Sequence, residues 1–110
     1  MIAQRVLHVV EDGKSHDVAI RLFLPEEDDD AWRCAYEIDW PEGTRAFRAF
    51  GQDAVQAIQL AMQMIGTELY TSDRHRAGML VSEVQGGGYG LPVPRSLRDL
   101  LVGDDITFFG

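Results

Sequence analysis

Few residues in this 110-residue chain have the type and spacing that catalysis requires. The run Asp73-Arg74-His75-Arg76 sets a carboxylate beside basic groups and comes nearest to an acid–base cluster. It falls within residues 71–78, which we interpret as an exposed loop, where such charged runs are usually solvated turns. We therefore predict a non-enzyme with no catalytic residue, and place Arg74 and His75 at the rim of a possible pocket.

Histidine and cysteine chemistry has little support. The three histidines, His8, His16 and His75, have no second ligand at helical or hairpin spacing, so we predict no metal site. Cys34 is the only cysteine, which excludes an intrachain disulfide and fits a reducing cytoplasm. It alternates with large aromatic residues on one strand face, which favours core packing over a nucleophile.

Residues 86–90, GGGYG, have the composition of a phosphate-binding loop. They are followed by Leu91 and Pro92, however, where a P-loop needs Lys and Ser or Thr, and no helix opens on them as in a dinucleotide site. We predict a flexible or tightly turned loop and no cofactor. Tyr89 within it is either a contact residue at the pocket rim or an anchor of the loop on the core.

Carboxylates dominate the charge. The net charge is −8 and the pI about 4.6, so the long-range field repels nucleic acid and anionic membranes. Residues 26–30, EEDDD, lack the alternating ligands and central glycine of a calcium loop, and we interpret them as a solvated loop. Their alternative role is an electrostatic contact for a basic partner, with Glu26, Asp28 and Asp30 as candidate contacts.

The elements that must position these groups are mostly strands. Residues 5–10, 17–24, 32–40 and 44–50 are β-branched, aromatic or alternating, and Asp12-Gly13 suits a tight hairpin turn. The even-numbered face of 17–24 and the aromatic face of 32–40 should point to the core. For 44–50 the sequence does not decide which face points inward. Short connections favour an antiparallel meander. Residues 79–84 are either a fifth strand or a buried connection.

The aromatic face of 32–40 has a second interpretation. Its Trp32, Tyr36 and Trp40 could form a platform that stacks a base or a sugar. Burial in the core is favoured, because the sheet needs a core and the net charge opposes nucleic acid.

Residues 51–70 predict the one long helix. Asp53 and Gln56 can form a capping box at its start. Gly66, in its interior, implies the close approach of another backbone. The residues at spacings of three and four form an apolar stripe that should cover the sheet: Val55, Ile58, Met62, Ile65 and Leu69. The polar side offers a candidate partner surface: Gln52, Gln56, Gln59 and Gln63.

The two ends of the chain give weaker signals. Residues 94–102 carry leucines at helical spacing before Gly103, which predicts a short C-terminal helix. The apolar end, with Ile106, Phe108 and Phe109, either docks on the core or provides a sticky patch for a partner or a second copy. The apolar run at the N-terminus is too short for a signal-peptide core or a membrane span.

The run GQDAVQAIQLAMQMIG at residues 51–66, followed by Leu69 and by the later Gly90-Leu91-Pro92, resembles a family of small bacterial domains of unknown function. The shared helix signature is GxDxxQAxxLAxxxIGxxL. The resemblance implies a stand-alone α+β domain of bacterial cytoplasm, and it carries over no catalytic or binding residue.

Together these patterns predict one α+β domain, residues 1–110, in which an antiparallel sheet of four to five strands packs against one long helix, with a short C-terminal helix. The expected function is a small acidic, non-catalytic protein-binding or regulatory module whose partner is basic. The expected state is a monomer or weak homodimer. The alternative is a small-molecule-binding protein or enzyme with a pocket between the sheet and the glycine-rich loop 86–90.

Overall fold

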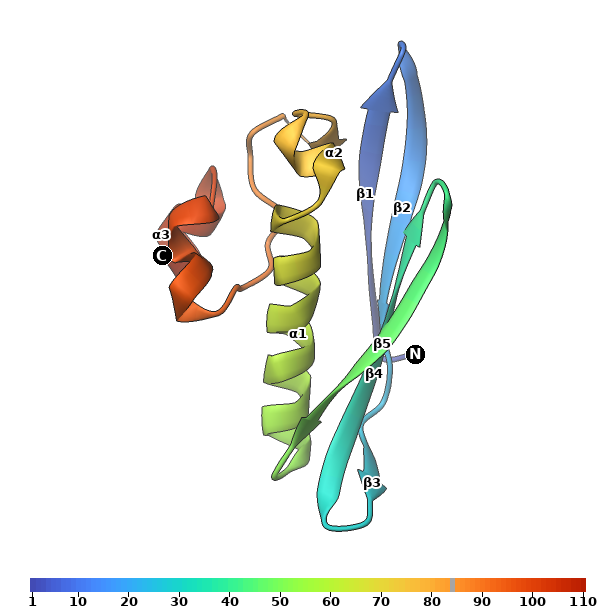
Figure 1. Ribbon diagram of the computed structural model, residues 1–110, viewed down its shortest axis with the longest axis vertical. Helices are drawn as coiled ribbons and strands as arrows, with labels where there is room; N and C mark the ends of the chain where they lie inside the picture. The colour runs from blue at the N-terminus through green and yellow to red at the C-terminus, as the bar shows by residue number, and fades with distance from the viewer. Residues whose placement is uncertain (84) are drawn as a thin grey trace.

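The computed structural model describes residues 1–83 and 85–110. A twisted antiparallel sheet lies on one side of a long helix, and the C-terminal segment lies on the other side of that helix (Figure 1). We call the side of the sheet that faces the helix the inner face, and the opposite side the outer face. The hairpin of the first two strands extends beyond the end of the helix.

Four long strands form the predicted meander. They are β1 (Ala3–Glu11), β2 (Lys14–Leu22), β4 (Ala31–Trp40) and β5 (Gly43–Gly51), and each pairs antiparallel with the next. The turn between β1 and β2 is made by Asp12 and Gly13, both at positive φ (52° and 75°), as its sequence predicts. The sheet is therefore built from local pairings with short connections.

Two short strands complete a six-stranded sheet in the described part of the chain. β3 (Glu26–Asp28) occupies the segment that we predicted to be a solvated loop, and that prediction is wrong. Glu26 lies opposite Arg33 on β4, and Arg33 forms ion pairs with Glu26 (2.7 Å) and Asp28 (3.7 Å). The guanidinium offsets the repulsion between these carboxylates, so the segment can pair as a strand.

β6 (Leu80–Val81) pairs with β1 on the opposite edge of the sheet. It covers only two residues of the 79–84 segment, and Val84 lies outside the described residues.

Helix α1 (Ala54–Tyr70) begins with the predicted capping box. The Asp53 carboxylate accepts from the Gln56 backbone N–H (2.7 Å), and the Gln56 side chain accepts from the Gln52 N–H (2.6 Å). Gly66 meets another backbone as predicted, because a Cβ at this position would overlap the Pro92 carbonyl oxygen.

The predicted apolar stripe of α1 is confirmed at Ile65 and Leu69, which are buried, but not at its N-terminal end. Ala57 and Ala61, which flank that stripe, are fully buried, whereas Val55 is 65% exposed. The small alanines let the helix axis approach the sheet closely, which a row of larger side chains would prevent.

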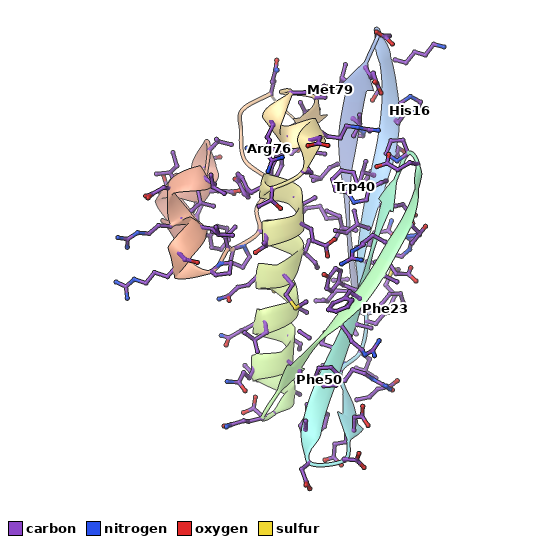
Figure 2. The ribbon with its side chains drawn as sticks, viewed as in Figure 1. His16, Phe23, Trp40, Phe50, Arg76 and Met79 are labelled. Carbon is purple, nitrogen blue, oxygen red and sulfur yellow. The ribbon has the colours of Figure 1, made fainter. Side chains whose placement is uncertain are left out.

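The inner face of the sheet carries the core. Its fully buried members on β1, β2 and β4 are Leu7, Val9, Val18, Cys34 and Ile38. Burial raises the pKa of the Cys34 thiol, which disfavours the reactive thiolate. On β5 the residue facing the core is Ala49, which settles the inward side of that strand. Phe23, by contrast, lies on the outer face, where no helix covers the sheet (Figure 2).

Short helices replace two predicted features. Residues 73–76 form helix α2 (Asp73–Arg76) rather than a loop, because the Ser72 side chain caps the His75 N–H. The predicted helix 94–102 is a 3-10 helix, η1 (Arg95–Leu100), and Gly103 begins a further helix, α3 (Asp104–Phe109). The apolar C-terminus is only partly docked, since Phe108 is 74% exposed. No helix among the described residues is long and apolar enough to cross a membrane.

Candidate functional site

A hollow lies where the sheet edge meets the glycine-rich segment. This edge cleft, of about 610 Å³, runs between β1 and the loop that follows β6. Its lining comes from β1 (Arg5, Val6, Leu7, His8), the residues after β6 (Ser82, Glu83), the glycine-rich segment (Gly87, Gly88, Tyr89, Gly90) and α3 (Asp104, Asp105, Phe108). The pocket that we proposed between the sheet and residues 86–90 thus corresponds to an actual hollow; whether it binds a ligand stays a prediction.

Arg5 joins the two walls of the edge cleft. Its Nη1 donates to the carbonyl oxygens of Tyr89 (2.9 Å) and Gly90 (2.7 Å). Glycine suits position 90 because its φ of +73° is one that residues with a side chain rarely adopt, and a Cβ there would also displace the Arg5 guanidinium. The Arg5 side chain is therefore held by backbone groups of the glycine-rich segment, which links β1 to that segment.

Asp105 fixes the glycine-rich segment from the opposite side. This carboxylate is only 2% exposed and accepts from the Tyr89 N–H (2.8 Å), the Gly90 N–H (2.8 Å) and the Tyr70 hydroxyl (2.5 Å). Gly88 allows the approach, since a Cβ there would lie 2.8 Å from the Asp105 Cγ. A buried carboxylate with three donors ties α3, α1 and the glycine-rich segment into one wall.

Aromatic rings pack behind this wall. Tyr70, His75 and Tyr89 lie with ring centroids 4.9 to 5.5 Å apart, and His75 Nδ1 is hydrogen-bonded to the Tyr89 hydroxyl. Burial raises the pKa of Tyr89 to about 12, with a further contribution from the Asp105 carboxylate. Burial, and then the charge of Arg76, lower the pKa of His75. Both rings are therefore held in their neutral forms at neutral pH.

The predicted rim residues are only partly brought together. His75 and Tyr89 both line a small cavity of about 180 Å³ next to the edge cleft. Arg74 does not line it; its Nη2 donates to Glu42 (2.9 Å) and links α2 to the turn between β4 and β5. Tyr89 is buried, so it anchors the glycine-rich segment on the core, and its backbone faces the edge cleft.

The other predicted contacts lie elsewhere. Gln56 and Gln59 are exposed on α1, Gln52 is exposed just before the helix, and Gln63 is half-buried. Gln56 is used by the capping box. Glu26 and Asp28 are paired with Arg33, while Asp30 is exposed in the turn after β3. Neither group borders the edge cleft.

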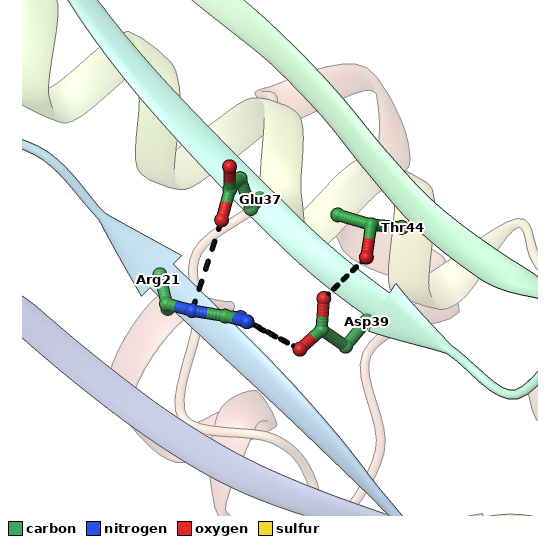
Figure 3. A network of polar contacts seen from close by, with 4 residues as sticks. All are labelled: Arg21, Glu37, Asp39 and Thr44. Carbon is green, nitrogen blue, oxygen red and sulfur yellow. Dashed lines mark hydrogen bonds and ion pairs between the residues drawn. The ribbon is translucent and has the colours of Figure 1, made fainter.

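The outer face of the sheet carries a network of polar contacts. Arg21 on β2 is hydrogen-bonded to the Asp39 carboxylate and lies 3.7 Å from Glu37, both on β4 (Figure 3). The Thr44 hydroxyl donates to the other Asp39 oxygen (2.7 Å). The single guanidinium is thus shared by two carboxylates, and the network links β2, β4 and β5 across the outer face.

Sequence reasoning missed the charged residues of the edge cleft. Arg5 could have been identified from the sequence, because it is the one charged residue on a strand face whose other members are Leu7 and Val9. Asp104 and Asp105 gave no such signal, because acidic residues in the first turn of a helix are common and nothing local shows which one is buried.

No cluster of three or more metal-ligating side chains occurs within residues 1–83 and 85–110.

No curated protein and no solved structure matches the chain significantly. A family model matches residues 3–93, which run from the start of β1 to three residues beyond the glycine-rich segment. The match covers β1 and the cleft-lining residues of the loop and glycine-rich segment, but not α3. The chain belongs to the family described as domain of unknown function DUF6968.

Proposed function

We propose that this protein is a non-catalytic binding module of bacterial cytoplasm that holds a basic segment of a partner protein in the edge cleft. The charge of the cleft lining carries the proposal. Three carboxylates, Glu83, Asp104 and Asp105, line it against one guanidinium, Arg5. The overall charge of −8 acts in the same direction and would speed the approach of a cationic partner.

The polar groups of the cleft have structural tasks, which supports binding over catalysis. Asp105 accepts from Tyr70 and from the glycine-rich backbone, and Arg5 donates to two carbonyl oxygens. Glu83 and Asp104 are exposed and remain available to a ligand.

Two charge-matched variants test the location. The cleft variant carries Glu83→Gln and Asp104→Asn. The control carries Glu27→Gln in β3 and Asp30→Asn in the turn after it, with the same change in net charge. Proteins captured from a bacterial lysate are compared at low and physiological ionic strength. We expect salt-sensitive capture that the cleft variant loses and the control retains. Capture that is indifferent to salt, or lost equally in both variants, contradicts the proposal.

A second candidate function rests on the cavity beside His75 and Tyr89. Its volume of about 180 Å³ suits a small metabolite, with one imidazole and one phenol as polar contacts. A thermal-shift screen with a metabolite library tests this function, because a ligand at 100 times its dissociation constant adds about 2.7 kcal/mol of stability. A screen without any shift rejects it.

The oligomeric state is part of the proposal: a monomer or a weak homodimer. Exposed Phe108 is the apolar group best placed for self-association. Sedimentation of a Phe108→Ser variant tests this contact. The substitution is preferred to truncation after Gly103, because truncation would also remove Asp105.

A further inference from the structure

The backbone of β1 presents an unused edge to the cleft. The Val10 N–H donates to the Met79 carbonyl (2.9 Å), so at Val10 the strand directs its peptide groups away from β2. Because this direction alternates along an antiparallel strand, Val6 and Gln4 direct their N–H and C=O groups the same way. β6 pairs with β1 only at His8 and Val9, and within the described residues no backbone group is hydrogen-bonded to Gln4 or Val6 on that side.

The space beside this edge suits an extended chain. A paired strand lies about 4.8 Å from its neighbour, and the edge cleft begins directly beside residues 5–8. The far wall is formed largely by Gly87, Gly88 and Gly90, which carry no side chain that would obstruct a second backbone. The Arg5 and Asp105 bonds hold that wall in place, so the site is preformed.

We propose that the bound segment of the partner is an added β-strand that pairs with the free edge of β1 at Gln4 and Val6 and places basic side chains in the edge cleft. The proposal rests on the proposed function and specifies its mode of binding. Alternate side chains of an added strand point to the inner face, the side on which α3 carries Asp104, and the others point to the outer face. The segment should therefore carry Lys or Arg at alternate positions.

The opposite edge of the sheet provides an internal comparison. The Phe23 N–H donates to the Ala35 carbonyl (3.0 Å). The backbone N–H and C=O groups of odd-numbered residues on β4 therefore point to β2, and those of even-numbered residues point to β5. On β5, Ala46 and Arg48 then direct their peptide groups outward. This edge carries Arg45 and Arg48 rather than carboxylates, and it suits a basic strand poorly.

The test uses the full chain and a random peptide library displayed on phage. Enriched peptides are synthesised, and their affinities are measured for the wild type, for Val6→Pro and for Ala46→Pro. Each proline removes one outward N–H from an edge strand, where proline is tolerated. We expect peptides with alternating Lys or Arg, whose affinity falls about tenfold or more in Val6→Pro and stays within about twofold in Ala46→Pro.

Amide hydrogen exchange of the wild type gives an independent readout if Val6→Pro does not fold. On peptide binding, the Gln4 and Val6 amides should become protected, while Arg5 and Leu7, already paired with β2, should change little.

The outcomes separate the two proposals. If no basic peptide is enriched, the proposed function fails. If basic peptides bind but neither Val6→Pro nor exchange at Gln4 and Val6 responds, the added strand is wrong and the function stands. If the chain itself dimerises with protection of those two amides, the occupant is a second copy, which overturns the basic partner segment.

Discussion

Replacing the buried carboxylate of Asp105 tests how the cleft wall is held. Asp105→Ala leaves the Tyr70 hydroxyl and the N–H groups of Tyr89 and Gly90 without their acceptor. An unsatisfied buried donor costs about 1–3 kcal/mol, and water entering the new cavity recovers part of it. We expect the free energy of unfolding to fall by about 3–5 kcal/mol, a large fraction of the roughly 5–15 kcal/mol that is typical of a domain.

The assay is urea unfolding followed by circular dichroism, with Asp99→Ala as the matched control. Asp99 is exposed in η1, so its replacement should change the free energy of unfolding by no more than about 0.5 kcal/mol. Asp105→Asn keeps the shape of the side chain. It should lower the free energy of unfolding by about 2–3 kcal/mol, because the new NH₂ group faces a backbone or hydroxyl donor.

A double-mutant cycle separates the Tyr70 contact from the rest of the network. If Asp105 and Tyr70 interact as described, Tyr70→Phe should cost less in the Asp105→Ala background than in the wild type, by about 1 kcal/mol. Equal stabilities of the Asp105→Ala and Asp99→Ala variants, or additive effects in the cycle, would refute the assignment of Asp105 as the residue that holds the wall.

Three further predictions follow from packing, ionisation and surface charge. Gly66→Ala should destabilise by about 1–3 kcal/mol in urea unfolding despite the better helix propensity of alanine, because its Cβ overlaps the Pro92 carbonyl; a stabilised variant contradicts the contact. Tyr89 has a folded-state pKa of about 12 against about 10 when unfolded, so the unfolded chain loses its proton first and stability should fall as pH rises from about 10 through 12. Phenolate absorbance should then rise together with unfolding, and ionisation of Tyr89 near pH 10 in a folded protein contradicts its burial. Gln59→Glu with Gln63→Glu should leave both the fold and partner capture unchanged if the edge cleft is the site; loss of capture would locate the site on α1 instead.

Much of the fold was accessible from local patterns. The meander of β1, β2, β4 and β5 follows from period-two alternation and short turns, and the start of α1 follows from Asp53 and Gln56. These features depend on groups within a few residues of one another. The face of α1 that meets the sheet was predicted correctly at Ile65 and Leu69 but not at Val55, because hydrophobicity alone favours Val55 over Ala57, whereas close packing selects the smaller residue.

The candidate site was much less accessible. The basic partner that we inferred from composition stays a prediction, and the glycines indicated only a loop. The cleft itself depends on contacts over long separations: Arg5 reaches Tyr89 and Gly90 across more than 80 residues, and Asp105 reaches Tyr70 across 35. No periodicity encodes such pairs, so the residues that shape the cleft are evident only once the chain is folded.

By itself, then, the sequence determined an acidic α+β chain with a local meander and one capped helix, and it showed through Gly66 that another backbone must cross that helix. The tertiary structure decided that residues 26–28 pair as a strand, that Asp105 is buried, and that Gln4 and Val6 have no backbone partner beyond β2 within residues 1–83 and 85–110. The physical reason is the range of the interactions. Alternation, turns and caps are local, whereas burial of a charge and an unpaired strand edge depend on what the remote parts of the chain cover.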